Sequence, residues 1–171
     1  MHNYLSPIDQ DHVDRTELMD LAEQLAAPGL IKHKERAIRV LTACCIANIL
    51  RLFAPDAPYS IEQFEMIFSL FLHQLKGVAE PDGPYYNYHY FLLESLSTVK
   101  SVVLIFDLPQ ADLLQREIIQ MALDMMMQPS LMKNVKLYLL ELVQTLLEEC
   151  DQISVELVAD LFIPHLMVGS S

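Results

Sequence analysis

Apolar residues recur every three or four positions along most of this chain, which is the spacing of one buried helix face. The clearest run is Ile61, Phe64, Phe68, Phe71 and Leu75. The same rhythm predicts seven helices, over about residues 16–26, 34–53, 60–76, 86–106, 111–126, 130–149 and 154–165. The β-branched run 102–106 is the best strand candidate, but it continues the helical face of the segment before it, so we assign it to that helix.

The predicted helix over 60–76 carries signals at both ends. Ser60 followed by Gln63 predicts a capping box, in which each side chain bonds the backbone of the other residue. Gly77 follows the last apolar position and is expected to stop the helix. The whole segment is therefore predicted to be an independent helix rather than the continuation of its neighbour.

Between two strongly apolar helices lies the sequence Ala54-Pro55-Asp56-Ala57-Pro58-Tyr59. Each proline fixes its own φ, lacks an amide donor and pushes the preceding residue toward extended backbone. These six residues, called the corner below, are therefore predicted to form a preset turn. Their small apolar faces and fixed carbonyls suit either a simple joint between helices or a surface that a partner recognises.

Helix-breaking residues, chiefly prolines, divide the helices into pairs. These pairs recur about every 45 to 50 residues, close to the period of HEAT-type helical hairpins. We predict an all-α fold, an α-solenoid of about three such hairpins in a right-handed superhelical stack, at about 34–77, 86–126 and 130–166 within a domain spanning 14–168. Residues 1–13 are expected to be a disordered tail and 169–171 a frayed end. Because the last hairpin has nothing to stack on, we expect the chain to be a fragment or to need a partner there.

The composition is that of a folded protein, with 53% hydrophobic residues in 171 and a net charge of −12. No window of about 18 residues is free of charged or strongly polar side chains, and the acidic N-terminus does not resemble a secretory signal. We therefore expect an intracellular protein with no membrane segment. Its three cysteines, Cys44, Cys45 and Cys150, are predicted to be buried, inert thiols.

One basic island interrupts the acidic chain. Residues 32–53 contain five basic residues and one acid; the basic residues are Lys32, Lys34, Arg36, Arg39 and Arg51. At about 100° per residue, the three arginines share one side of the helix that leads into the corner. They form either a solvated polar face or a docking strip for an acidic peptide.

Catalysis and nucleic-acid binding find no support in this pattern. The four glycines form no phosphate loop, and the chain has no nucleophile elbow, paired-acid motif or metal-ligand spacing. A pI near 4.7 with one small basic island offers few phosphate contacts. We expect no enzyme activity, no cofactor, no metal and no direct nucleic-acid binding by this segment.

The run from Lys32 to Lys76, KHKERAIRVLTACCIANILRLFAPDAPYSIEQFEMIFSLFLHQLK, resembles the N-terminal HEAT repeats of the cohesin-associated family named for precocious dissociation of sisters. The similarity continues through Tyr88 to Ser101, YHYFLLESLSTVKS. The most specific part is the combination of Ala43-Cys44-Cys45, then Arg51, then the corner.

The resemblance implies a nuclear, chromatin-associated, non-catalytic regulator of sister chromatid cohesion. Members of that family bind the kleisin subunit of cohesin, and they act with the wings-apart-like release factor or with acetyltransferase and sororin-type cohesion factors. The resemblance also implies that the corner is a docking site for short peptide motifs of such partners, which here means Ala54, Pro55, Asp56, Ala57, Pro58 and Tyr59.

Our hypothesis for the corner is that Asp56 holds an arginine of the partner, while Arg51 and Arg39 flank the notch. The alternative is that the corner only joins two helices and that Tyr59 seals the core. At the level of the protein, the alternatives are a generic helical-repeat adaptor without a role in cohesin and an all-helical enzyme, for which the sequence nominates no pocket.

Overall fold

The computed structural model describes residues 14–150, and every regular element in this part is a helix, which confirms the predicted all-α class. The α-helices are α2 (Arg15–Leu25), α3 (Pro28–Ile31), α4 (Arg36–Phe53), α5 (Ile61–Leu75), α6 (Tyr86–Val99), α7 (Ala111–Met126) and α8 (Lys133–Glu148), with 3₁₀ helices η2 (Lys76–Ala79) and η3 (Ser101–Asp107). The expected tail over 1–13, the predicted helix over 154–165 and the end at 169–171 lie outside the described residues.

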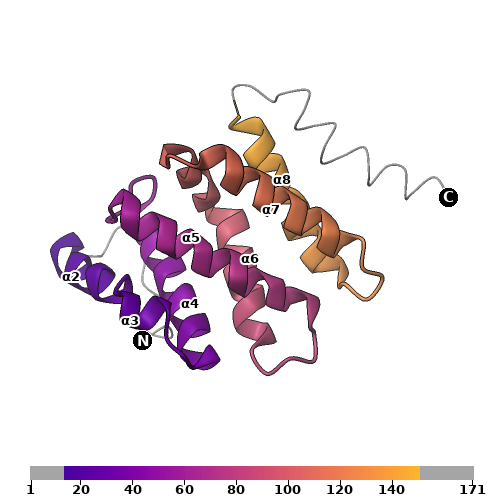
Figure 1. Cartoon of the computed structure of the whole chain (residues 1–171), viewed down its shortest axis with the longest axis horizontal. Coiled ribbons are helices and arrows are strands. Elements are labelled where there is room, and N and C mark those ends of the chain that lie inside the picture. Colours follow the sequence, from indigo (N-terminus) through magenta and orange to yellow (C-terminus); the bar gives the residue numbers. More distant parts are fainter. Residues whose placement is uncertain (1–13, 151–171) are drawn as a thin grey trace.

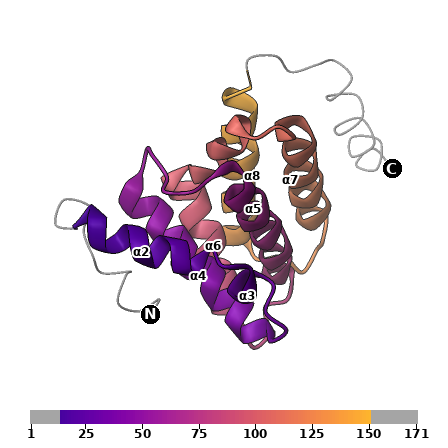
Figure 2. The same ribbon diagram turned by 60° about the vertical axis from the view of Figure 1, so that its left-hand side comes forward.

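The helices stack in two layers (Figure 1). Helices α4, α6 and α8 lie side by side in one layer, and α5 and α7 cover them on one face. At the N-terminal end, α2 and α3 follow one another across α4 (Figure 2). The pairs α4–α5 and α6–α7 are helical hairpins joined in sequence, and each contributes one helix to each layer, as the repeat pattern predicts.

Side-chain hydrogen bonds join the repeats at buried positions. The Ser97 hydroxyl of α6 donates to the Tyr138 carbonyl of α8 at 2.9 Å. The side-chain amide of Gln115 in α7 donates to the Leu146 carbonyl of α8 at 3.3 Å. These bonds satisfy polar groups inside an apolar core and fix the helices against sliding.

The predicted helix over 86–106 is in fact two elements. Helix α6 ends at Val99, because Lys100 adopts the left-handed conformation with φ 60°, and η3 continues at a bend of 71°. The apolar spacing runs through both pieces, so it gave no sign of the bend. Val102 and Ile105 of η3 are buried in the core, and the β-branched residues there weaken the preference for a continuous α-helix.

Gly77 does not stop α5 in the way the sequence suggested. The helix ends at Leu75, and Gly77 lies inside η2 without the positive φ of a glycine cap. Its role is steric, because a Cβ on Gly77 would collide with the imidazole ring of His89 in α6. The glycine therefore allows the η2 backbone to approach α6 closely.

The adjacent cysteines of α4 are buried, as predicted. Cys44 donates to the Tyr88 carbonyl of α6 at 3.4 Å. Burial, with a smaller effect of Cys45, raises the pKa of the Cys44 thiol to about 12. Both thiols are therefore protonated at neutral pH and serve as small packing groups. Cys150 is only half-buried.

Within residues 14–150, no single helix is long and apolar enough to cross a membrane. Helices α6 and η3 meet the criteria of length and composition only when they are counted together across their 71° bend.

Replacing Gly77 by alanine is expected to lower the free energy of unfolding by about 1–3 kcal/mol, because the new methyl group has to displace His89. Gly29→Ala is the matched control, since a Cβ at Gly29 meets nothing within 4 Å and alanine favours the helix. Chemical denaturation of both variants measures the difference. Equal stability of the two variants would contradict the close packing of η2 on α6.

His89 is expected to make stability depend on pH. Burial, and next the charge of Arg36, lower the pKa of His89 from its ordinary value of 6.5, with Glu80 acting in the opposite direction. The unfolded chain therefore binds the proton at a higher pH than the folded chain, and the free energy of unfolding falls as pH drops below about 6.5. Denaturation at several pH values measures this fall in the free energy of unfolding. The fall should be smaller for His89→Gln than for the control His73→Gln, which removes an exposed histidine. Equal falls in the two variants would contradict the role of His89.

Candidate functional site

The corner forms the turn between α4 and α5, as the two prolines predict. Ala54 leaves the helix with extended backbone at φ −50° and ψ 140°, and the Ala54–Pro55 peptide bond is cis. Pro55 and Asp56 are exposed, whereas Ala57, Pro58 and Tyr59 are half-buried. The outermost point of the turn is therefore a proline followed by a carboxylate.

Strong local structure fixes the corner on its C-terminal side. The capping box predicted at the start of α5 is present. The backbone amide of Gln63 donates to Ser60 Oγ at 3.2 Å, and the backbone amide of Ser60 donates to Gln63 Oε1 at 2.9 Å. These two bonds satisfy amides that no carbonyl of the helix reaches. The chain therefore enters α5 directly after Tyr59 in a defined direction.

Tyr59 connects the corner to the core. Its ring meets Phe64 edge-on, with ring centres 5.6 Å apart, and Phe64 continues through Phe68 to Phe71 in a chain of ring contacts at 5.9 and 5.7 Å. The Tyr59 hydroxyl is buried and has no hydrogen-bond partner within the described part of the chain. Burial raises the pKa of this hydroxyl above its ordinary value. Tyr59 thus anchors the corner and keeps its hydroxyl away from the surface.

The two arginines expected to flank the corner are far apart. Arg51 lies in the last turn of α4, next to the corner. Arg39 is twelve residues earlier, about 18 Å away at a rise of about 1.5 Å per residue. Its Nη1 donates to the carbonyls of His33 at 2.6 Å and Lys34 at 3.1 Å, and so holds the loop that precedes α4. The structure therefore brings Arg51, but not Arg39, to the corner.

The rest of the basic island is also divided. Arg36 lies 3.9 Å from the Glu80 carboxylate, and its guanidinium is 5.6 Å from the centre of the Tyr85 ring. These partners belong to the loop before α6, at the opposite end of α4 from the corner. The continuous basic strip predicted from helical angles is thus separated into groups with different neighbours.

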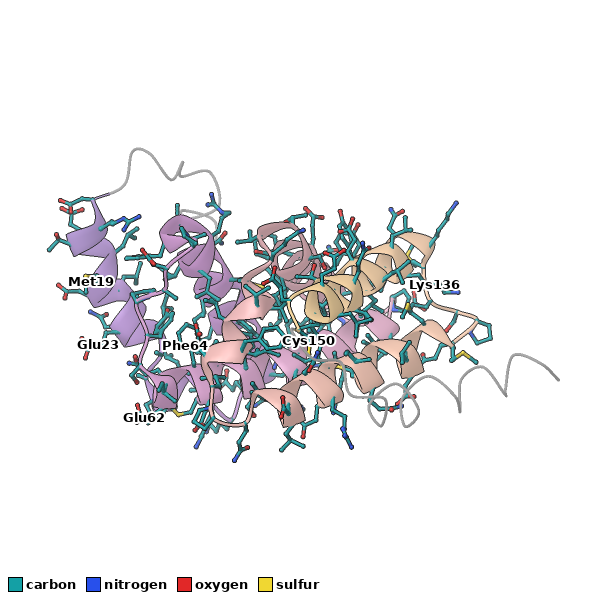
Figure 3. All side chains as sticks on the ribbon, turned by 90° about the horizontal axis from the view of Figure 1, so that it is seen from above. Met19, Glu23, Glu62, Phe64, Lys136 and Cys150 are labelled. Atoms are coloured by element: carbon teal, nitrogen blue, oxygen red, sulfur yellow. The ribbon has the colours of Figure 1, made fainter. Side chains whose placement is uncertain are left out.

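The structure adds Arg15 to the surroundings of the corner. The Arg15 guanidinium, at the start of α2, lies 5.8 Å from the centre of the Phe53 ring, and Phe53 is the last residue of α4. Figure 3 shows Glu62, in the first turn of α5, at the outer edge of the molecule, with Phe64 further inside. Arg15 was not foreseen, because no sequence pattern indicates that α2 folds back against the end of α4.

The corner presents one exposed carboxylate, that of Asp56. Asp56 is exposed, and it forms no hydrogen bond or ion pair with the residues the structure describes. A carboxylate on a rigid turn accepts bidentate hydrogen bonds from an arginine. Among residues 14–150, no three His, Cys, Asp or Glu side chains are arranged to hold a metal ion.

Comparison with known proteins identifies similar chains. The family model described as "Sister chromatid cohesion protein PDS5 protein" matches residues 1–167. The sister chromatid cohesion protein pds5 of Schizosaccharomyces pombe is 40% identical over 149 residues, which cover 87% of this chain and 12% of that protein. The PDS5 homolog A of Homo sapiens is 32% identical over 158 residues, which cover 91% of this chain and 12% of that protein.

A solved structure has a similar fold. A chain from the work described as "Structure of the Pds5-Scc1 complex and implications for cohesin function" matches with a TM-score of 0.84 and 32% identity. The match covers 92% of this chain and 23% of that chain. The chain therefore spans about a tenth of the length of the curated relatives and about a quarter of the solved chain.

Removing the hydroxyl of Tyr59 tests its anchoring role. Tyr59→Phe is expected to keep or to raise the free energy of unfolding, by up to about 1 kcal/mol, because the hydroxyl is buried without a partner. Tyr59→Ala, which removes the ring contact with Phe64, is expected to lower it by about 2–4 kcal/mol. Urea denaturation measures both; a clear loss of stability in Tyr59→Phe would mean that the hydroxyl has a partner.

Proposed function

This chain belongs to the sister chromatid cohesion protein PDS5 family, and we propose that it serves as a HEAT-repeat module of a cohesin-associated regulator that docks short peptide motifs at the corner. The observation that supports this most is the geometry of Pro55 and Asp56. They are the exposed tip of a turn whose flanking residues are packed or capped on both sides.

A rigid tip favours peptide binding on energetic grounds. A flexible loop loses conformational entropy when a partner orders it, whereas a turn fixed by two prolines and a capping box has lost that entropy already. Asp56 supplies the single charge of the corner, and an arginine of the partner is the natural counterpart. Ala57 and Pro58 offer half-buried apolar surface next to this charge.

Arg51 belongs to the proposed site as the basic neighbour of the corner, where an acidic or carbonyl group of the same peptide can meet it. Arg39 belongs to a different surface, because it lies about 18 Å away and supports the loop before α4. The peptide site is therefore proposed to comprise Ala54 to Tyr59 together with Arg51.

The partners we propose are those of the cohesin system. They are the kleisin subunit for the longer protein, and the wings-apart-like factor, sororin-type antagonists and cohesion acetyltransferases for short motifs. The similarity to a chain solved in a Pds5-Scc1 complex supports a cohesin partner. Such a role places the protein in the nucleus on chromatin and requires no catalysis by this module.

Family membership favours this function over a generic helical-repeat adaptor, which would share the hairpins but would have no reason to match the family over residues 1–167.

The proposal is tested by Asp56→Lys. Peptides that tile the wings-apart-like factor are measured for binding by fluorescence anisotropy, and the tightest is compared between variants. Reversal of the charge is expected to cost about 2 kcal/mol, on the order of a thirtyfold rise in Kd, because an arginine loses a charge-assisted pair.

The matched control is Asp82→Lys, which makes the same change in net charge at an exposed position in the loop before α6. It is expected to bind like the unmodified chain. Unchanged binding by a folded Asp56→Lys variant would remove Asp56 from the site, and an equal loss in both variants would show that only long-range charge matters.

A further inference from the structure

A groove lies along α5 on the side of α3, away from the corner. Its volume is about 480 Å³, and its lining residues are Ile31, Lys32, Arg39, Glu65, Met66, Ser69, Leu70 and His73. Three segments form the groove: α3 and the loop after it pack along α5, and the first turn of α4 contributes Arg39.

The lining of this groove carries more positive than negative charge, with Lys32 and Arg39 against Glu65. Lys32 and His73 are exposed, and Arg39 is half-buried. Glu65 is the only acid among the lining residues. On a chain with a net charge of −12, a groove with this lining is a local exception, and it attracts an acidic segment that the remaining surface repels.

Arg39 is already positioned for this role. One of its terminal nitrogens, Nη1, donates to the carbonyls of His33 and Lys34, at 2.6 and 3.1 Å. These bonds hold the guanidinium at the wall of the groove before any partner arrives. A fixed guanidinium loses little side-chain entropy when it pairs with a carboxylate.

The floor of the groove is apolar. Ile31 and Leu70 are buried, and Met66 is half-buried. Methionine adapts its shape to different neighbours, so this floor suits one aliphatic side chain of a bound peptide. The apolar floor suits an apolar anchor of a bound peptide. The cationic groups at the rim suit its acidic residues.

A second groove of about 420 Å³ borders the other side of the same helix face. It shares Glu65, Ser69 and His73 with the first groove, and its other lining residues are Leu72, Lys76, Gln110, Leu114 and Glu117. Two acids therefore face Lys76 in this second groove, so the excess of positive charge belongs to the first groove alone.

We propose that the groove between α3 and α5 is a second docking site, which binds an acidic peptide segment with an aliphatic anchor. His73 is thirteen residues along α5 from Ser60, about 20 Å from the corner at the helical rise. The site therefore uses residues that the corner does not, and its existence does not depend on peptide binding at Asp56.

The test uses two fluorescein-labelled peptides of about twelve residues. One consists of aspartate and glutamate with two leucines four positions apart, and its neutral twin has asparagine and glutamine in place of the acids. The acidic peptide is expected to bind the whole chain and to weaken as salt rises, and the neutral twin is expected to bind at least tenfold more weakly.

Lys32→Glu is expected to weaken the acidic peptide about fivefold or more, because it replaces attraction by repulsion at the rim. Lys34→Glu is the matched control: it has the same charge change two residues away, is exposed, and does not line the groove. Asp56→Lys should not weaken this binding, which separates the groove from the corner.

Three results would overturn the proposal. They are equal binding of the acidic peptide and its neutral twin, an equal loss in Lys32→Glu and Lys34→Glu, and binding of a single-stranded oligothymidylate as tight as that of the acidic peptide. In the last case the surface would respond to negative charge alone rather than to a peptide. Thermal unfolding of each variant verifies that the fold is intact.

Discussion

The burial of helix α4 is the constraint on which the other helices and the corner depend. Twelve of its eighteen residues are buried, and it packs against α2, α3, α5 and α6. Its C-terminal end leads directly into the corner, where Pro55 and Pro58 cannot continue a helix and fix the direction in which the chain turns toward α5.

The same geometry explains how one short segment joins two helices and also offers the proposed recognition site. The inner part of the corner, Ala57 and Tyr59, packs against the core, and the line of rings from Tyr59 to Phe71 carries that contact into the body of α5. The outer part, Pro55 and Asp56, is left exposed on a base that cannot move freely. The two alternatives for the corner, a joint and a docking surface, are thus compatible, because the joint makes the proposed docking surface rigid.

Local signals in the sequence predicted the parts of the fold that depend on neighbours in the chain. The capping box at Ser60, the extended Ala54 and the burial of Cys44 follow from such signals, and the helical spacing located most helices. The bend after Val99, the contact of Gly77 with His89 and the separation of Arg39 from Arg51 did not follow, because each depends on where a different helix packs. Angles around one helix show which side chains share a face. They do not show which backbone groups of other segments those side chains bind.

The proposed function rests on recognition of partners at the exposed tip of the corner. Site-specific photo-crosslinking tests it most directly, with benzoylphenylalanine in place of the exposed Pro55 and, as a comparison, in place of the exposed Leu137 on α8. In nuclear extract, we expect the probe at position 55 to crosslink to a cohesin subunit or a cohesin-associated factor identified by mass spectrometry, and an excess of the tightest corner-binding peptide to abolish the crosslink. Crosslinks to such factors from position 137 alone, or crosslinks from position 55 that the peptide leaves unchanged, would contradict recognition at the corner.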